Sequence, residues 1–295
     1  MYGHQAVLLN EVLSYLDPQP GRRYIDATFG GGGHARALLE RTAPGGSVLA
    51  LDLDEKALEQ GRQAFPDGES CGSRLILAQA NFKDIVPVAQ AQGFMEVDGI
   101  LADIGVSSMM LDDPERGFSF MREGPLDMRM DRSEEITAAD IVNTYSEKEI
   151  ADILYVYGEE RRSRPIARSI VHKRPHATTI DLVGAVQRVL GGPRYGKIHP
   201  ATRTFQALRI AVNGELDNLQ IFLNSAPSCL KPGGRLAVIT FHSLEDRIVK
   251  NAFRSSAMPG KPLTKKVVIA TPGEVHSNSR ARSAKLRVWE KNHGD

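Results

Sequence analysis

The chain of 295 residues is long enough for one enlarged domain or two ordinary ones with a sizeable core. Its composition, 41% hydrophobic and 25% charged, excludes a disordered chain, and no apolar run approaches the roughly 18 residues that a membrane span needs. Two cysteines, Cys71 and Cys229, are too few for a disulfide framework or to complete a four-ligand zinc site, and composition alone leaves a metal site of His, Asp and Glu ligands open. The first residues lack the basic segment of a signal peptide, so we expect a cytoplasmic protein without a membrane partner.

The formal net charge of +1 conceals two halves of opposite sign. Residues 1–160 hold 13 Lys and Arg against 28 Asp and Glu, which gives −15. Residues 161–295 hold 24 against 8, which gives +16. This asymmetry predicts a polyanionic partner such as nucleic acid, although two solvated surfaces would produce the same counts.

Strand and helix patterns alternate through the first hundred residues. A short buried strand is predicted at residues 24–28, further strands at 47–52, 74–78 and 97–102, and helices at residues 35–41, 54–65 and 84–92. Repeated strand and helix units form a parallel sheet with helices on both faces. The fold class predicted from this pattern is α/β.

The alternation stops after Gly105 and resumes more than a hundred residues later. Helical spacing fills the interval, at residues 137–145, 147–158, 163–173, 179–190, 201–213 and 215–225. A turn at 231–234 then leads into a strand at 235–241 and a helix at 244–253, and runs at 265–270 and 286–289 are placed to form a closing hairpin. We therefore predict a sheet domain from residues 1–108 and 229–295, with a helical insertion at 109–228.

A run of four glycines follows the first predicted strand, in the sequence DATFGGGGH. Glycine lets the backbone approach a ligand, and the free N–H groups of the next helix start attract one. The spacing of Gly30, Gly32 and Ala35 also fits the relaxed dinucleotide fingerprint. This loop predicts a nucleotide-like ligand without separating NAD from S-adenosylmethionine, and a flexible turn without a ligand remains the alternative.

Three further strand ends carry residues suited to a nucleoside. Asp52 could accept hydrogen bonds from both ribose hydroxyls, Phe82 could pack on adenine, and Asp103 ends the fourth strand, where open α/β sheets bind ligands. Each of these residues could instead have an ordinary structural role, such as a helix cap, an aromatic of the core or a solvated acid. Their joint arrangement is typical of Rossmann-like methyltransferases.

Other chemistries find little support in the sequence. Ser107 and Ser108 lack the G-x-S-x-G pattern of serine hydrolases, no Walker lysine follows the glycines, and the eight histidines show no metal-ligand spacing. We expect no metal site. Two basic concentrations could contact phosphates or merely face solvent: Arg161, Arg162, Arg164, Arg168, Lys173 and Arg174 in the insertion, and Arg280, Arg282, Lys285 and Arg287 near the end.

Long runs of the chain resemble the small-subunit rRNA cytosine-N4 methyltransferase family, also called MraW. They cover nearly the whole length and begin at His4, Tyr24, Asp98, His199, Leu230 and Ser279. The resemblance implies a Rossmann-like S-adenosylmethionine-dependent methyltransferase sheet. It also implies a cytidine in the decoding region of 16S rRNA, in the small ribosomal subunit, as acceptor, and an insertion that recognises the substrate. The oligomeric state stays open, a homodimer included.

Carried over by position, the resemblance implies a donor site made of Gly32, Gly33, His34, Asp52, Phe82, Asp103 and Met110. One of these departs from the family, because Met110 stands where a polar Gln is common and can offer only backbone contacts or thioether packing. Asp103 is the candidate catalytic residue, with the region of Ser107 and His242 as alternatives. The rival interpretations are a NAD-dependent oxidoreductase and a non-catalytic RNA-binding protein.

Overall fold

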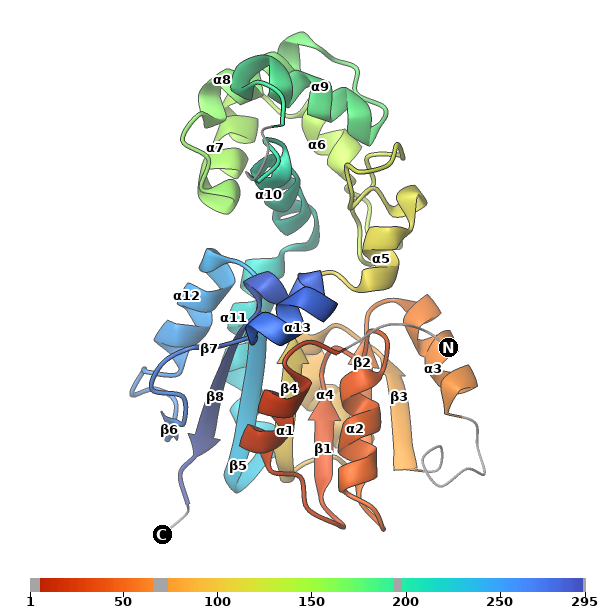
Figure 1. Cartoon of the computed structure of the whole chain (residues 1–295), viewed down its shortest axis with the longest axis vertical. Coiled ribbons are helices and arrows are strands. Elements are labelled where there is room, and N and C mark those ends of the chain that lie inside the picture. The colour runs from red at the N-terminus through yellow and green to blue at the C-terminus, as the bar shows by residue number, and fades with distance from the viewer. Residues whose placement is uncertain (1–5, 66–73, 194–197, 294–295) are drawn as a thin grey trace. The chain divides into compact units, whose positions relative to one another are not determined.

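The computed structural model describes residues 6–65, 74–193 and 198–293, so Cys71 and the start of the first matching run, His4 and Gln5, lie outside it. Two compact units divide the chain (Figure 1). The sheet unit comprises Met1–Gly105 and Leu216–Asp295, and the helical unit comprises Val106–Glu215. None of the helices in the described part of the chain is long and apolar enough to cross a bilayer.

The sheet unit is built on strands that run in the order β3 (Leu75–Gln79), β2 (Ser47–Asp52), β1 (Arg23–Asp26), β4 (Val97–Asp103), β5 (Leu230–Thr240), β8 (Lys285–Lys291) and β6 (Gly260–Pro262). The five strands from β3 to β5 are parallel, and β8 is antiparallel to β5. The strand order reverses at β1. The strands β2 and β4 therefore lie on either side of β1. This arrangement confirms the α/β, Rossmann-like prediction, and open sheets of this kind bind ligands at such a reversal.

Alternate residues of each central strand enter cores on opposite faces of the sheet. Ile25 and Leu49 contribute to the core beneath α4 (Ile85–Ala91), α11 (Glu215–Ser225) and α12 (Ser243–Ala252). Tyr24 and Val48 contribute to the core beneath α1 (Leu9–Leu16), α2 (Gly33–Arg41) and α3 (Glu55–Ala64). Helices on both faces therefore bury the sheet and leave the ends of its strands for a ligand.

The last strands differ in detail from the sequence prediction. The runs at 265–270 and 286–289 do pair antiparallel, but through only two residues of β7 (Val268–Ile269). Between β7 and β8 the chain forms α13 (Pro272–Ser277) and a short 3-10 helix, η5 (Ser279–Ser283). The strand β6 was not predicted, because three residues are too few to display a period.

The C-terminal boundary of the helical insertion differs from the prediction. The sequence placed residues 216–228 in the insertion, whereas Leu219, Phe222 and Leu223 of α11 are fully buried in a core of the sheet unit. The helical spacing was correct and its assignment was not, because an apolar stripe does not say which core it enters.

The helical unit holds five helices of seven residues or more among its described residues, and all five were predicted: α6 (Ala138–Thr144), α7 (Glu147–Gly158), α8 (Ser163–His172), α9 (Thr179–Leu190) and α10 (Thr202–Asn213). Capping boxes start α6, α7 and α9, each with a Ser or Thr side chain and an acidic residue three positions on. The buried faces of these helices share one apolar core with the short α5 (Ser108–Asp112) and the loop that follows it.

Candidate active site

The glycine loop bends tightly between β1 and α2. Gly30 and Gly32 have φ values of +51° and +73°, and Gly32 is the N-cap of α2. A Cβ atom on Gly32 would lie 2.8 Å from the Phe29 ring, and one on Gly33 would lie 3.0 Å from Cβ of Ala6. Gly32 therefore needs glycine both for its backbone conformation and for space, whereas Gly30 needs it for conformation and Gly33 for its close approach to Ala6.

Asp52, at the end of β2, holds this loop in place. Its Oδ2 accepts the N–H of Gly30 at 2.7 Å, and its Oδ1 accepts the N–H of Asp54 at 2.8 Å. Burial raises the pKa of Asp52 to about 6, although these hydrogen bonds act in the opposite direction. Each carboxylate oxygen keeps a further lone pair, so the side chain can still accept the hydroxyls of a ribose.

Asp103 lies on the other side of β1, at the end of β4. Its backbone N–H donates to Oγ1 of Thr28 at 2.6 Å, and its Oδ2 lies 3.9 Å from Nδ1 of His34. Its Oδ1 is buried, and no group in the described ranges hydrogen-bonds it. Burial, and then the negative charge of Glu245, raise the pKa of Asp103 to about 7.

Sequence reasoning missed Asp26, which ends β1 between these two acids. The residue is fully buried, its Oδ1 accepts the N–H of Thr28 at 3.2 Å, and its Oδ2 has no hydrogen-bond partner within the described structure. Burial raises its pKa well above the ordinary value, and the charges of Asp103 and Asp52 act in the same direction. Its position just before the glycines was the available signal.

Glu245 was also missed, and it is likewise fully buried. Its Oε2 accepts the N–H groups of Phe241 at 2.8 Å and His242 at 3.2 Å. The Nδ1 of His242 accepts the N–H of Glu245 at 3.4 Å, and its Nε2 lies 3.1 Å from Oε1 of the same residue. These contacts form the capping box of α12, so His242 is already engaged in starting a helix.

Phe82 follows β3 and is only partly buried, with its ring edge to face against Phe222 at 5.5 Å between centroids. The N–H of Ala80 donates to the carbonyl of Asp52 at 3.0 Å, which ties this strand end to that of β2. The remaining predicted residue, Met110, belongs to the helical unit and packs in its core at 5% exposure. The sheet unit thus brings together the other predicted residues without Met110.

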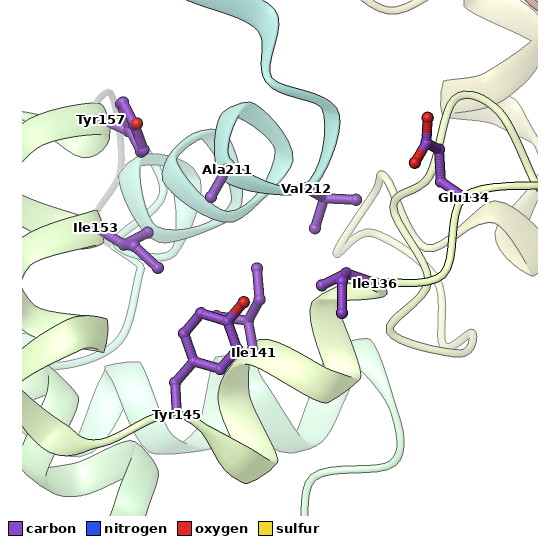
Figure 2. A pocket seen from close by; sticks show the side chains of 8 residues that line it. All are labelled: Glu134, Ile136, Ile141, Tyr145, Ile153, Tyr157, Ala211 and Val212. Atoms are coloured by element: carbon purple, nitrogen blue, oxygen red, sulfur yellow. The ribbon is translucent and has the colours of Figure 1, made fainter.

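The helical unit carries a pocket of its own, with a volume of about 340 Å³ (Figure 2). Figure 2 shows apolar side chains and the rings of Tyr145 and Tyr157 around it, with Glu134 from a neighbouring loop. Its lining contains one carboxylate and no other ionisable group apart from the two phenols. This pocket therefore has no counterpart of Asp52, Asp103 and the glycine loop of the sheet unit.

The acids at the three strand ends, Asp26, Asp52 and Asp103, form no ion pair with Lys or Arg of the described residues. Enclosed carboxylates without a cation are unfavourable, and their raised pKa values express this cost. The arrangement suits a ligand that has hydroxyl donors and positive charge. A polyanion at the same position would meet repulsion.

Comparison with known proteins places the chain in a family. Residues 1–292 match the model of the MraW methylase family. A protein of Sorangium cellulosum named ribosomal RNA small subunit methyltransferase H is 52% identical over 288 residues, which cover 97% of this chain and 90% of that protein. A protein of the same name from Nostoc is 49% identical over 292 residues, 99% of this chain and 93% of that one. The chain belongs to the MraW methylase family.

Proposed function

We propose that this chain transfers the methyl group of S-adenosylmethionine to N4 of a cytidine in the decoding region of 16S rRNA, in the small ribosomal subunit. The observation that carries this proposal is the group of acids, Asp26, Asp52 and Asp103, which lie around a glycine loop without a Lys or Arg partner among the described residues. The family membership and the names of the Sorangium and Nostoc relatives support the reaction class and the rRNA substrate. The reaction would take place in the cytoplasm, where ribosomal subunits assemble.

The charges favour S-adenosylmethionine over NAD as the ligand. The donor carries a sulfonium and an ammonium group, whereas NAD brings a pyrophosphate to the glycine loop. Orphaned carboxylate oxygens of Asp26 and Asp103 suit the cations, and the Asp52 carboxylate suits a ribose. The residues present therefore fit the donor, and the oxidoreductase alternative loses its support.

Asp103 is the proposed proton acceptor. The sulfonium of the bound donor supplies a methyl group that is already activated by positive charge. Cytosine N4 becomes acidic as it attacks, and the buried Oδ1 of Asp103, which no group in the described ranges hydrogen-bonds, can take its proton. Neither oxygen of Asp103 serves a helix cap, in contrast to the side chain of His242.

Mapping of methylated nucleosides tests the proposal directly. Small subunits or 16S rRNA that lack the modification are incubated with the protein and isotopically labelled donor, and the rRNA fragments are analysed by mass spectrometry. We expect label on N4 of one cytidine, and calorimetry should detect binding of S-adenosylmethionine but not of NAD. Tight binding of NAD without binding of the methyl donor would overturn the proposal.

Asp52→Ala is expected to weaken donor binding by about 1 to 3 kcal/mol, because ribose hydroxyls would lose their acceptor. The substitution also frees the N–H of Gly30, so the loop loses a support at the same time. Asp52→Asn keeps one carbonyl oxygen and should retain part of the affinity. Calorimetry with S-adenosylmethionine measures both variants, and an unchanged affinity in Asp52→Ala would remove this residue from the site.

A further inference from the structure

A buried segment, residues 6–8, lies against the start of α2. Ala6 is the residue that a Cβ on Gly33 would meet, at 3.0 Å. The carbonyl oxygen of Val7 lies 3.0 Å from Nε2 of His34, in a buried hydrogen bond. A carbonyl can only accept, so Nε2 must carry the hydrogen and the other ring nitrogen, Nδ1, lies toward Asp103.

Leu8 has a backbone conformation that its side chain disfavours. Its φ of +54° and ψ of +32° lie in the left-handed region, where a residue other than glycine is strained. Its side chain is fully buried, and its carbonyl accepts the N–H of Val12 at 2.9 Å to start α1. Such strain persists only where surrounding contacts impose it.

The contact that holds the Leu8 amide comes from a distant part of the chain. Its N–H donates to Oε1 of Glu274 at 2.7 Å, across 266 positions of sequence. Glu274 belongs to α13, and its own N–H donates to Oγ1 of Thr271, the cap of that helix, at 3.2 Å. The carboxylate is therefore anchored on a short, capped element rather than on a loose loop.

We propose that Glu274 is a positioning residue of the methyl-donor site. By holding the N–H of Leu8 it fixes the preceding carbonyl, that of Val7, and this carbonyl sets the tautomer and orientation of the His34 ring beside Asp103. The inference rests on the proposed function, because it assumes that His34 and Asp103 serve the donor. It assigns a role in that site to a residue of α13, which contributes no group to the glycine loop.

Two substitutions of Glu274 separate its hydrogen bond from its charge. In the full chain, Glu274→Ala removes the acceptor, whereas Glu274→Gln keeps an oxygen that can accept the Leu8 N–H. We expect Glu274→Ala to weaken S-adenosylmethionine binding about tenfold, and Glu274→Gln to stay within about threefold of wild type. The nitrogen chemical shifts of His34, measured without ligand, should show a mixture of tautomers in the Ala variant and the Nε2-protonated form in the Gln variant.

A matched control is Glu149→Ala in the helical unit. Glu149 also occupies the third position of a helix, where it accepts the N–H of Ser146. This variant loses a side-chain acceptor at the same helix position, and the acceptor of the Leu8 N–H is left in place, so its donor affinity and its His34 spectrum should equal those of wild type. A change of both readouts in the control would attribute the effect to general destabilisation and overturn the proposal.

The remaining outcomes also decide the question. Wild-type tautomer and affinity in Glu274→Ala would overturn the inference, and so would a Gln variant as impaired as the Ala variant. If Glu274→Ala fails to fold, Glu274→Asp retains the charge and shortens the reach, and it should show the same tautomer mixture. If wild type binds no S-adenosylmethionine at all, the proposed function fails, while the His34 spectra still show whether Glu274 positions the ring.

Discussion

Asp103→Asn is expected to lower the rate of methyl transfer by about 10²- to 10⁴-fold, while affinity for the small subunit or its rRNA changes less than about twofold. The substitution keeps the size of the side chain but removes its capacity to take a proton. The Asp103 backbone N–H still donates to Thr28, so the end of β4 keeps its support. The loss should therefore concern the reaction and not the substrate surface.

Single-turnover methylation with saturating donor measures this effect, because it separates the chemical step from donor binding. A matched control is Asp98→Asn near the opposite end of the same strand, whose carboxylate accepts the N–H of Arg23 at 2.9 Å. The control should lose stability and keep its turnover. If saturating donor restores the full rate of Asp103→Asn, this residue is only a ligand of the cofactor.

The pH dependence of turnover has a defined sign. Burial and the charge of Glu245 raise the pKa of Asp103 to about 7, so this carboxyl is protonated in much of the free protein just below neutral pH. A protonated carboxyl can neither accept a proton nor attract a cationic donor. The ratio kcat/KM should therefore fall as pH decreases below about 7, and rate profiles should lose this limb in Asp103→Asn.

The same substitution should stabilise the fold at pH 8. A carboxyl whose pKa rises from 3.8 in the unfolded chain to about 7 contributes stability that is present below pH 4 and lost as pH rises through 7. Asparagine does not ionise, so the variant avoids this loss of stability, which amounts to at most roughly 4 kcal/mol. Solvent makes the loss smaller, because the side chain of Asp103 is 21% exposed. Denaturant unfolding of both proteins at pH 5 and pH 8 measures this difference. The free energy of unfolding of Asp103→Asn should exceed that of wild type mainly at pH 8.

The central sheet was predictable because its strands follow a strong local pattern. Each strand from β1 to β4 is bounded by glycines, caps or charged residues, so its period is readable in isolation. The strand β6 and the destination of α11 were not predictable, because both depend on which distant partner covers them. Helical spacing fixed the existence of α11 but not the core that buries Leu219 and Phe222.

The candidate site was partly predictable for a related reason. Residues at the carboxyl ends of parallel strands share an edge of the sheet, so the sequence could assign Asp52 and Asp103 to the same site. The buried state of Asp26 and Glu245 could not, since it depends on the packing of the glycine loop and of α12. Among the predicted basic residues, the structure pairs Lys285 and Arg287 with Asp246, at 3.6 and 2.7 Å, and so commits them to the fold.

The helical unit supplies an accessible basic cluster. Arg161, Arg162 and Arg164 are all exposed, and within the described residues none of the three forms a side-chain ion pair. Their neighbour Arg168 lies 3.4 Å from Glu147, and Arg174 donates to the carbonyls of Val142 and Tyr145. The first three are therefore well placed to meet phosphates.

Binding of the small subunit or its rRNA should weaken steeply with salt, because each neutralised phosphate releases counterions and contributes about 0.7 to 0.9 to the slope of log K against log salt. Charge reversal at Arg161, Arg162 and Arg164 should reduce that slope by about 2 to 3 and leave S-adenosylmethionine affinity unchanged. Filter binding between about 50 and 200 mM salt, a range over which phosphate contacts lose much of their affinity, measures the slope.

Two further variants locate the contacts. Lys148→Glu changes an exposed residue of the same unit that already pairs with Asp152 at 3.3 Å, so its slope should stay close to wild type. Reversal of Arg280 and Arg282, both exposed on η5, asks whether the sheet unit shares the phosphate contacts. A slope that none of these reversals alters would mean that the positive half of the chain is a solvated surface and that other residues hold the RNA.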